Sequence, residues 1–311
     1  PDIIQKYEAK YPEIHMIEGS GKGPGASRNR GLKLAKGDYI VFADADDYLP
    51  DKEIFCKYIN LAEQTDADIV VSNYARLWKD KILPATKHQS FALCSPSSEE
   101  FRFQGFFSVG TLSYAWGKLY RREFLRNHQI YFADLSYAED KLFNMQCHIC
   151  DAKYAFLEDI GYIYRKNDMS VSWQYRPDSV ENWFKLVYEL KSWIEKKDKD
   201  PKEYTSLIGY LLIFAAFFDG KMEYMQYKKS LWAVRKVLKN YGSNPMGRKA
   251  FTELADRRKK LQITQKLWKI MIRTFSLGMK WRWYLLMSVG IKILVSCRVD
   301  ERLSDTGIRK K

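Results

Sequence analysis

Cysteine is scarce in this sequence, with five scattered among 311 residues. So few cysteines exclude a disulfide-stabilised scaffold, and the odd count without a recognisable secretory signal favours a reducing, cytoplasmic setting. Cys147 and Cys150 have CxxC spacing, but no second ligand pair follows at the distance of a zinc site. We therefore expect two ordinary helix thiols.

Long apolar runs are also missing, since no stretch reaches the roughly 18 apolar residues that span a bilayer. The best runs, 207–218 and 283–295, are shorter, and Lys292 interrupts the second. We expect no membrane-spanning helix, which leaves open a segment that lies on a membrane surface.

Apolar residues are nevertheless plentiful, at 46% of the chain with 15% aromatic, so the sequence can form a packed core and is not disordered. The length suggests about two domains. Charge is uneven: residues 1–220 carry a net −3 and residues 221–311 a net +17, giving +14 overall. Such a basic third implies an anionic partner, either nucleic acid or a membrane surface.

Helix and strand patterns alternate in the first 75 residues, with helices at 3–11, 26–36 and 51–64 and strands at 14–17, 39–43 and 68–74. The apolar run 39–43 is typical of a central parallel strand, so we predict an open α/β sheet. Residues 76–110 resemble a long loop, and from about 182 the pattern is helical. We place a domain boundary near 175, between residues 1–175 and a helical region 176–311.

An acidic cluster, Asp44-Ala45-Asp46-Asp47, directly follows the predicted strand 39–43. Ligands of open α/β sheets bind beyond the carboxyl ends of strands. Oxygens of Asp44 and Asp46 could hold a hard divalent cation together with phosphates and water. A solvated turn before the next helix explains the same residues without a ligand.

A glycine-rich loop, residues 19–25, precedes the helix that carries Arg28 and Asn29. Glycines and a helix N-terminus together favour phosphate binding. The loop fails the Walker A pattern, but Gly21-x-Gly23-x-x-Ala26 fits a dinucleotide-binding fingerprint. An NAD-dependent oxidoreductase with a Rossmann domain is therefore an alternative.

Glu139 and Asp140 begin another helix, where acids either complement the helix dipole or supply a general base. Trp116 and Lys118 in WGKLY, and Arg165 in YRKND, could contact a sugar or a phosphate. A buried tryptophan and a basic surface turn are the plainer explanations.

Together these motifs, "GASRNRGLKLAKGDYIVFADADDYL", "WGKLYRREFL", "YAEDKLF" and "YIYRKNDMSVS", resemble in order the family 2 glycosyltransferases of GT-A fold, over residues 1–175. The resemblance implies inverting transfer of a sugar from a nucleotide-sugar donor, most often a UDP-sugar. It implies metal binding by Asp46 and Asp44, with manganese or magnesium as cofactor, and Asp140 as the base.

The resemblance also assigns donor binding to Gly25, Arg28, Asn29 and Asp44. Trp116, Lys118, Glu139 and Arg165 fall on the acceptor or phosphate side. Family members open with strands ending near "PVYN" and "DDGS", which this sequence lacks. We therefore expect a sheet without its first two strands, and a chain that is inactive or poorly folded by itself. Asn167 and Asp168 stand where relatives have a metal-binding His.

The basic third contains one amphipathic pattern. Lys266, Lys269, Arg273 and Lys280 share one helical side, and a second side is apolar: Trp268, Met271, Ile272, Phe275 and Met279. This pattern favours a helix in a membrane interface, extended by Trp281 and Trp283. A helix packed on its own domain is the alternative. No nucleic-acid recognition module is visible.

The sequence thus predicts a cytoplasmic glycosyltransferase, peripheral at the inner face of the cell membrane, that builds surface polysaccharide. Its partners would be a nucleotide-sugar donor, a saccharide or lipid-linked acceptor and an anionic membrane surface, with no nucleic acid. Besides the oxidoreductase, a catalytically inactive membrane-bound interaction module is an alternative.

Overall fold

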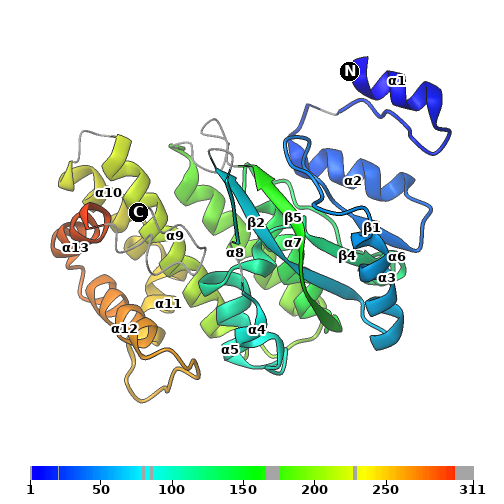
Figure 1. Cartoon of the computed structure of the whole chain (residues 1–311). Coiled ribbons are helices and arrows are strands. Elements are labelled where there is room, and N and C mark those ends of the chain that lie inside the picture. The colour runs from blue at the N-terminus through cyan, green and yellow to red at the C-terminus, as the bar shows by residue number, and fades with distance from the viewer. Residues whose placement is uncertain are drawn as a thin grey trace.

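The computed structural model describes residues 2–19, 21–78, 81–84, 87–165, 176–226 and 230–297 (Figure 1). Helices and strands alternate in its first half, and helices alone follow. The elements of the first half are α1 (Asp2–Lys10), α2 (Pro24–Leu34), β1 (Tyr39–Val41), α3 (Ile54–Thr65), β2 (Ile69–Trp78), β3 (Lys81–Pro84), α4 (Gln89–Ala92), α5 (Glu99–Phe103), a π-helical turn (Gln104–Ser108), a 3-10 turn (Thr111–Ser113), β4 (Lys118–Arg121), α6 (Arg122–His128), α7 (Glu139–Ile149) and β5 (Tyr154–Arg165).

The sheet is mixed, and β2 is its central strand. On one side β2 pairs with β5 in parallel, from Ile69 opposite Tyr154 onward. On the other side it pairs antiparallel with β4 at its start and with β3 at its end. β1 joins only β4, antiparallel, so β1 is an edge among the described strands. The prediction that residues 39–43 form a central parallel strand is therefore wrong.

Helices cover both faces of the sheet, as the alternation of side chains along β2 requires. Val70 faces the small cluster formed with Ile54, Tyr58 and Ala62 of α3. Ile69 and Val71 face the main core, which includes Phe143 of α7 and continues into the C-terminal helices. This arrangement holds β1 and the start of α7 in fixed positions beside each other.

Two segments differ from the sequence prediction. Residues 14–17 form no strand, because no described strand pairs with them. Residues 76–110 are no plain loop, since they complete β2 and contain β3, α4 and α5. The buried rings of Phe91, Phe101 and Phe106 anchor this segment in the main core.

The C-terminal region is helical, as predicted. It consists of α8 (Ser179–Lys196), α9 (Thr205–Gln226), α10 (Leu231–Ser243), α11 (Pro245–Ala255), α12 (Lys266–Lys280) and α13 (Tyr284–Ser296). Figure 1 shows α12 and α13 at the end of the molecule opposite α1 and α2.

Within the described ranges, α9 is the one helix long and apolar enough to cross a membrane. It lies in the middle of the helical region, where Leu207, Tyr210 and Leu211 are buried against its neighbours. A core helix passes the same test of length and composition. Asp219 of this helix is buried and accepts hydrogen bonds from the hydroxyls of Ser179 and Tyr241, both at 2.6 Å.

Helix α12 forms over the predicted residues, but its predicted membrane-facing side packs on protein. Ile272 and Met279 are buried, and Trp268 and Phe275 pack against the main core. The guanidinium of Arg273 turns inward and donates to the carbonyl of Asp256 at 2.8 Å. The assignment of this apolar side to a membrane is therefore wrong, because α9 and α11 supply it with a protein partner.

Candidate active site

One arginine joins the carboxylate of Asp44 to those of Glu139 and Asp140, which lie far from it in the sequence. Arg28 of α2 donates to Asp44 Oδ1 at 2.7 Å, to Asp140 Oδ1 at 2.6 Å and to Glu139 Oε1 at 3.0 Å. Its side chain is mostly buried, and so are those of Glu139 and Asp140. The cluster therefore keeps an excess of negative charge in a partly buried place.

The acidic turn follows β1 directly. The backbone N–H of Asp47 donates to the carbonyl of Asp44 at 3.1 Å, which closes the turn, and Asp46 at its tip is exposed. The backbone N–H of Asp44 donates to the hydroxyl of Tyr162 at 3.0 Å. A strand end and a tyrosine of β5 thus fix the position of Asp44.

Asp47 is the inner carboxylate of this turn. Its oxygens accept hydrogen bonds from the Tyr162 hydroxyl and from the backbone N–H of Arg165, both at 2.8 Å. Burial raises the pKa of Asp47 to about 6 even though these hydrogen bonds oppose the rise. Asp47 therefore ties the acidic turn to the end of β5, whereas Asp46 points to solvent.

Asp140 lies in the first turn of α7. Ala138, the residue immediately before the helix, has φ of 62°. This left-handed conformation costs a non-glycine residue energy. Asp140 Oδ2 accepts the backbone N–H of Ala115 at 3.0 Å, opposite the oxygen that Arg28 contacts. Burial raises the pKa of Asp140, and the charge of Arg28 opposes that rise.

Two buried lysines hold the segment that presents the Ala115 N–H group. Lys118 donates to the carbonyl of Thr111 at 2.8 Å and also to the carbonyl of Tyr114. Lys141 donates to the carbonyl of Phe106 and to the hydroxyl of Ser113, both at 2.7 Å. Burial lowers the pKa of each ammonium to about 7. Lys118 is thus directed at backbone carbonyls and away from solvent.

Trp116 is buried in a stack of aromatic rings. Its ring lies parallel to those of Tyr114 and Tyr162, with centroids 4.5 and 4.6 Å apart, and Tyr74 meets it edge-on. Since Tyr162 also bonds Asp44 and Asp47, the stack supports the acidic turn. The Arg165 guanidinium lies over the ring of Tyr48 in that turn.

Gly25 and Asn29 dock α2 onto the segment before α7. Asn29 donates to the Phe132 carbonyl at 2.7 Å and accepts the Phe132 N–H at 2.9 Å. A Cβ atom on Gly25 would lie 3.2 Å from carbons of both Glu139 and Phe132. Both residues therefore position Arg28, and their predicted contact with a donor remains a prediction.

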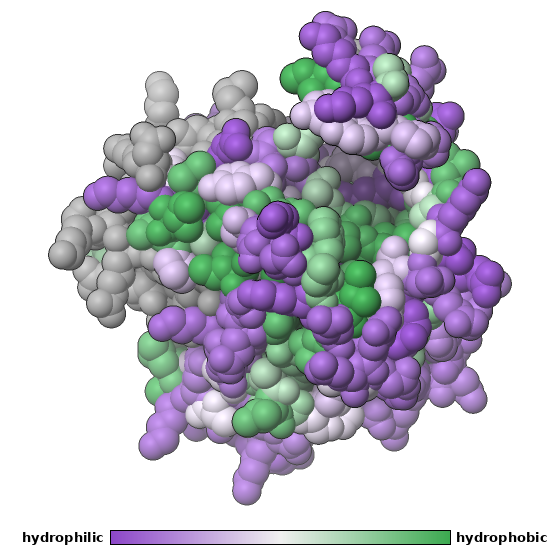
Figure 2. All heavy atoms as spheres, turned by 45° about the vertical axis from the view of Figure 1, so that its right-hand side comes forward, coloured by the Kyte–Doolittle hydropathy of each residue, from purple (hydrophilic) through white to green (hydrophobic). Residues whose placement is uncertain are grey.

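The surface near this end of the sheet is hollowed. Figure 2 shows a hollow between the N-terminal segment and the body, with hydrophilic side chains at its back. α1 has no buried residue, and Ile3 and Tyr7 on it are exposed. Of the acidic residues described above, Asp46 is exposed, whereas Glu139 and Asp140 are mostly buried.

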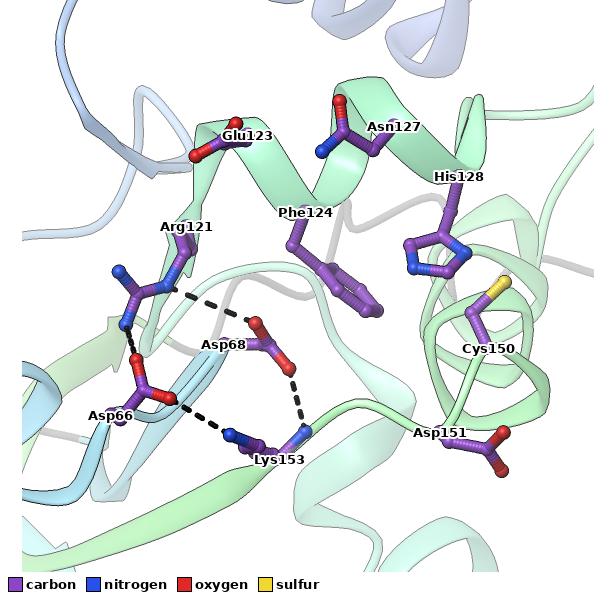
Figure 3. A pocket seen from close by; sticks show the side chains of 10 residues that line it. All are labelled: Asp66, Asp68, Arg121, Glu123, Phe124, Asn127, His128, Cys150, Asp151 and Lys153. Atoms are coloured by element: carbon purple, nitrogen blue, oxygen red, sulfur yellow. Dashed lines mark hydrogen bonds and ion pairs between the residues drawn. The ribbon is translucent and has the colours of Figure 1, made fainter.

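A separate cavity of about 430 Å³ lies at the opposite end of β2 (Figure 3). Asp66 there is paired with Arg121 and Lys153, and Asp68 accepts the backbone N–H of Lys153 at 2.9 Å. None of the predicted site residues lines it. Since its cations are already paired, it does not compete with the Arg28 cluster as the site.

The acidic cluster offers oxygen ligands, which suit magnesium or manganese. Across the described ranges, no three His, Cys, Asp or Glu side chains are grouped so as to hold a metal. Any cation held by exposed Asp46 and by Asp44, whose Oδ1 accepts from Arg28, would therefore have to take its remaining ligands from phosphate and water. Asn167 and Asp168 lie outside the described residues.

Four predicted residues come together: Arg28, Asp44, Glu139 and Asp140. Sequence analysis did not find the Ala115 N–H group, Lys141 or Tyr162. The Ala115 N–H group has no motif that marks it, whereas Lys141 stands in the quoted "YAEDKLF" segment and Tyr162 in "YIYRKNDMSVS", so both could have been noticed. A strand-end acidic turn beside a buried helix-start carboxylate is an arrangement that suits nucleotide binding and acid–base chemistry.

Comparison with known proteins agrees with this chemistry. Residues 1–128 match the family described as "Glycosyl transferase family 2". The chain is 30% identical over 194 residues to the uncharacterized glycosyltransferase EpsJ of Bacillus subtilis, covering 61% of this chain and 56% of that protein. It is 27% identical over 217 residues to a poly(ribitol-phosphate) beta-glucosyltransferase of Bacillus spizizenii, covering 68% and 32%.

Among solved structures, Staphylococcus aureus TarS 1-349 in complex with UDP-GlcNAc has a TM-score of 0.62 at 20% identity. The match covers 91% of this chain and 77% of that one. Residues 1–128 thus match the family 2 glycosyltransferases, and the chain has the GT-A fold. It spans a third to little more than half of the length of the two curated relatives named above. The strand missing at residues 14–17 removes the basis of the Rossmann alternative, because that fingerprint must follow a strand.

Proposed function

We propose that this protein transfers a sugar, with inversion, from a nucleotide-sugar donor to a hydroxyl group of a saccharide or lipid-linked acceptor. The observation that carries the proposal is the Arg28 cluster, which joins the acidic strand end at Asp44 to the helix-start carboxylate of Asp140. The bound donor and the general base would then lie next to each other in one site. The family match of residues 1–128 supports the same reaction class.

Asp140 is proposed as the general base. Its burial raises its pKa, which makes the carboxylate a better proton acceptor than an exposed one. The acceptor hydroxyl loses its proton to Asp140 while its oxygen bonds the anomeric carbon. The bond from that carbon to the diphosphate oxygen breaks, and the nucleoside diphosphate leaves. Arg28 and the Ala115 N–H group keep the carboxylate oriented.

The donor is proposed to be a UDP-sugar, held beside the acidic turn. Two observations support this: the exposed Asp46 beside Asp44, and the likeness of the fold to a structure that contains UDP-GlcNAc. Asp46 and Asp44 would hold manganese or magnesium, which when bound neutralises charge on the diphosphate. Trp116, Glu139 and Arg165 are proposed to shape the acceptor or phosphate side.

Surface polysaccharide at the inner face of the cell membrane is the proposed setting. Relatives named for poly(ribitol-phosphate) glycosyl transfer support a polymeric acceptor. The basic C-terminal third supports an anionic membrane partner.

The test is nucleoside diphosphate release by the full-length protein from a panel of UDP-sugars, with manganese, magnesium or a chelator. We expect metal-dependent release with one donor and weaker donor binding by Asp46→Asn. Asp159→Asn, an exposed carboxylate on β5 paired with Lys57, is the matched control and should behave as wild type. Absence of release with every donor and acceptor would favour the inactive interaction module.

A further inference from the structure

The end of the molecule formed by α12 and α13 carries exposed apolar side chains, among them the two tryptophans, Trp281 and Trp283, that extend the predicted amphipathic pattern. Trp281 is 60% exposed, Trp283 54% and Leu286 65%. These side chains stand at the corner between the two helices, where Trp283 N–H donates to the Gly278 carbonyl at 2.9 Å. Two large aromatic rings are thus held outward by a fixed backbone turn.

The exposed apolar side chains continue along both helices from this corner. On α12 the exposed apolar residues are Leu267 and Ile270, three residues apart. On α13 they are Leu285, Leu286 and Ile293. The buried sides of the helices are occupied by other residues, since Ile272 and Tyr284 pack in the core. Several large apolar side chains are thus exposed on two adjoining helices, and grouped exposed apolar side chains mark a site of interaction more often than single ones do.

The charge around this surface has one sign. Residues 266–297 contain six Lys and Arg and no Asp or Glu. In the part of the chain that the structure describes, none of the six forms an ion pair, and Lys266, Lys280, Arg282 and Lys292 are exposed. The partner therefore combines an apolar interior with a negatively charged surface.

We propose that the α12–α13 surface binds an anionic lipid bilayer. We define it by its exposed side chains, Leu267, Ile270, Trp281, Trp283, Leu285, Leu286 and Ile293, with Lys266, Lys269, Lys280, Arg282 and Lys292. Tryptophans fit the headgroup zone, aliphatic side chains enter the acyl boundary, and lysines contact anionic headgroups. The inference rests on the proposed peripheral function. It keeps the predicted lysines and tryptophans but replaces the buried apolar side of α12 with exposed residues.

This surface also constrains the acceptor. Figure 1 shows α12 and α13 at the end of the molecule opposite α2, which carries Arg28. A lipid-linked acceptor must therefore extend from the bilayer toward the site, so we infer a saccharide chain in preference to a single sugar on its lipid.

The experiment is cosedimentation of the full-length protein with two kinds of vesicle, phosphatidylcholine alone and phosphatidylcholine mixed with phosphatidylglycerol. We expect binding to the anionic vesicles that salt reduces. Replacing Lys280 and Arg282 by Gln should weaken the partition on the order of 30-fold, because each cation contributes roughly fivefold. Trp281→Ala with Trp283→Ala should weaken it roughly tenfold or more.

Matched controls lie elsewhere on the molecule. Tyr7, 52% exposed on α1, is replaced by Ala, and exposed Lys33 and Lys36 are replaced by Gln. These variants should bind vesicles as wild type does. Unchanged binding by the α12–α13 variants, or equal losses in the controls, would overturn the proposal.

A change in oligomeric state of the tryptophan variants without vesicles would also overturn the proposal and show a contact between copies instead. Binding to vesicles needs neither donor nor acceptor. Its failure is therefore distinct from a failure of sugar transfer, which the nucleotide-release test measures.

Discussion

Arg28 and Asp140 lie 112 residues apart in the sequence, yet the guanidinium donates to the carboxylate at 2.6 Å. The same guanidinium contacts Asp44 at 2.7 Å, so one side chain links helix α2, the end of β1 and the start of α7. Removing it leaves three carboxylates close together without a counter-charge.

Replacing Arg28 is therefore expected to disable the site. Arg28→Lys keeps the charge but loses the planar fork that reaches separate carboxylates, so we expect at least a tenfold lower transfer rate, on the order of 1.4 kcal/mol or more. Arg30→Lys is the control, because Arg30 lies two residues away on α2 and donates to the Glu18 carbonyl. Equal steady-state rates for both variants would remove Arg28 from the site.

Transfer should also depend on pH through Asp140. Burial raises its pKa, and only the deprotonated carboxylate accepts a proton, so the rate should fall as the pH drops through that raised pKa. Arg28→Lys should shift the acid limb of the pH–rate profile upward, since a weaker ion pair opposes the rise less. If the acid limb of the pH–rate profile is the same in Arg28→Lys as in wild type, Arg28 does not control the pKa of Asp140.

Helix α2 offers a matched pair of glycine substitutions. Gly25→Ala places a methyl group 3.2 Å from carbons of Glu139 and Phe132, and we expect a loss of about 1–3 kcal/mol of unfolding free energy. Gly31→Ala meets nothing within 4 Å, and we expect a gain of about 0.5–1 kcal/mol from helix propensity. Urea denaturation measures both, and equal effects would contradict the close packing at Gly25.

Lys118 and Lys141 are expected to matter for the segment that holds Asp140. Lys118→Met leaves buried carbonyls without a donor and should cost about 2–4 kcal/mol of stability. Lys153→Met, which removes an exposed ion pair with Asp66, should cost at most about 1 kcal/mol. Similar thermal midpoints for the two variants would show that the buried ammonium is dispensable.

Buried Asp219 predicts a pH-dependent stability. Burial raises its pKa from 3.8 to about 6, so the folded state favours the protonated form. Its contribution of about 3 kcal/mol is fully present below the unfolded pKa and is lost as the pH rises through the folded pKa. Asp219→Asn should remove this loss of unfolding free energy between about pH 4 and 6. An unchanged pH dependence in urea denaturation would contradict it.

Much of the site followed from the sequence, because its parts are local motifs. Asp44 was recognisable because it follows a predicted strand, and Asp140 because it lies in the first turn of a predicted helix. Their meeting through Arg28 needs the tertiary fold. Lys118 was expected at a phosphate, but carbonyls of its own turn surround it. The sequence showed which chemical groups are present, but it did not show where the Lys118 side chain points.

The fold shows the same division. β1 and β2 were expected from their apolar runs at residues 39–43 and 68–74, and both strands are present. The insertion of β4 between β1 and β2 depends on a pairing across many residues, which no local pattern reports. Burial of the apolar side of α12 likewise depends on neighbours that only the fold supplies.

The most direct test of the central claim compares donor binding with transfer in Asp140→Asn. Asparagine keeps the size of the side chain and an oxygen for Arg28 but accepts no proton. We predict that calorimetry gives wild-type affinity for the UDP-sugar donor while transfer to the acceptor falls by at least about a hundredfold. Wild-type transfer by Asp140→Asn would contradict the account.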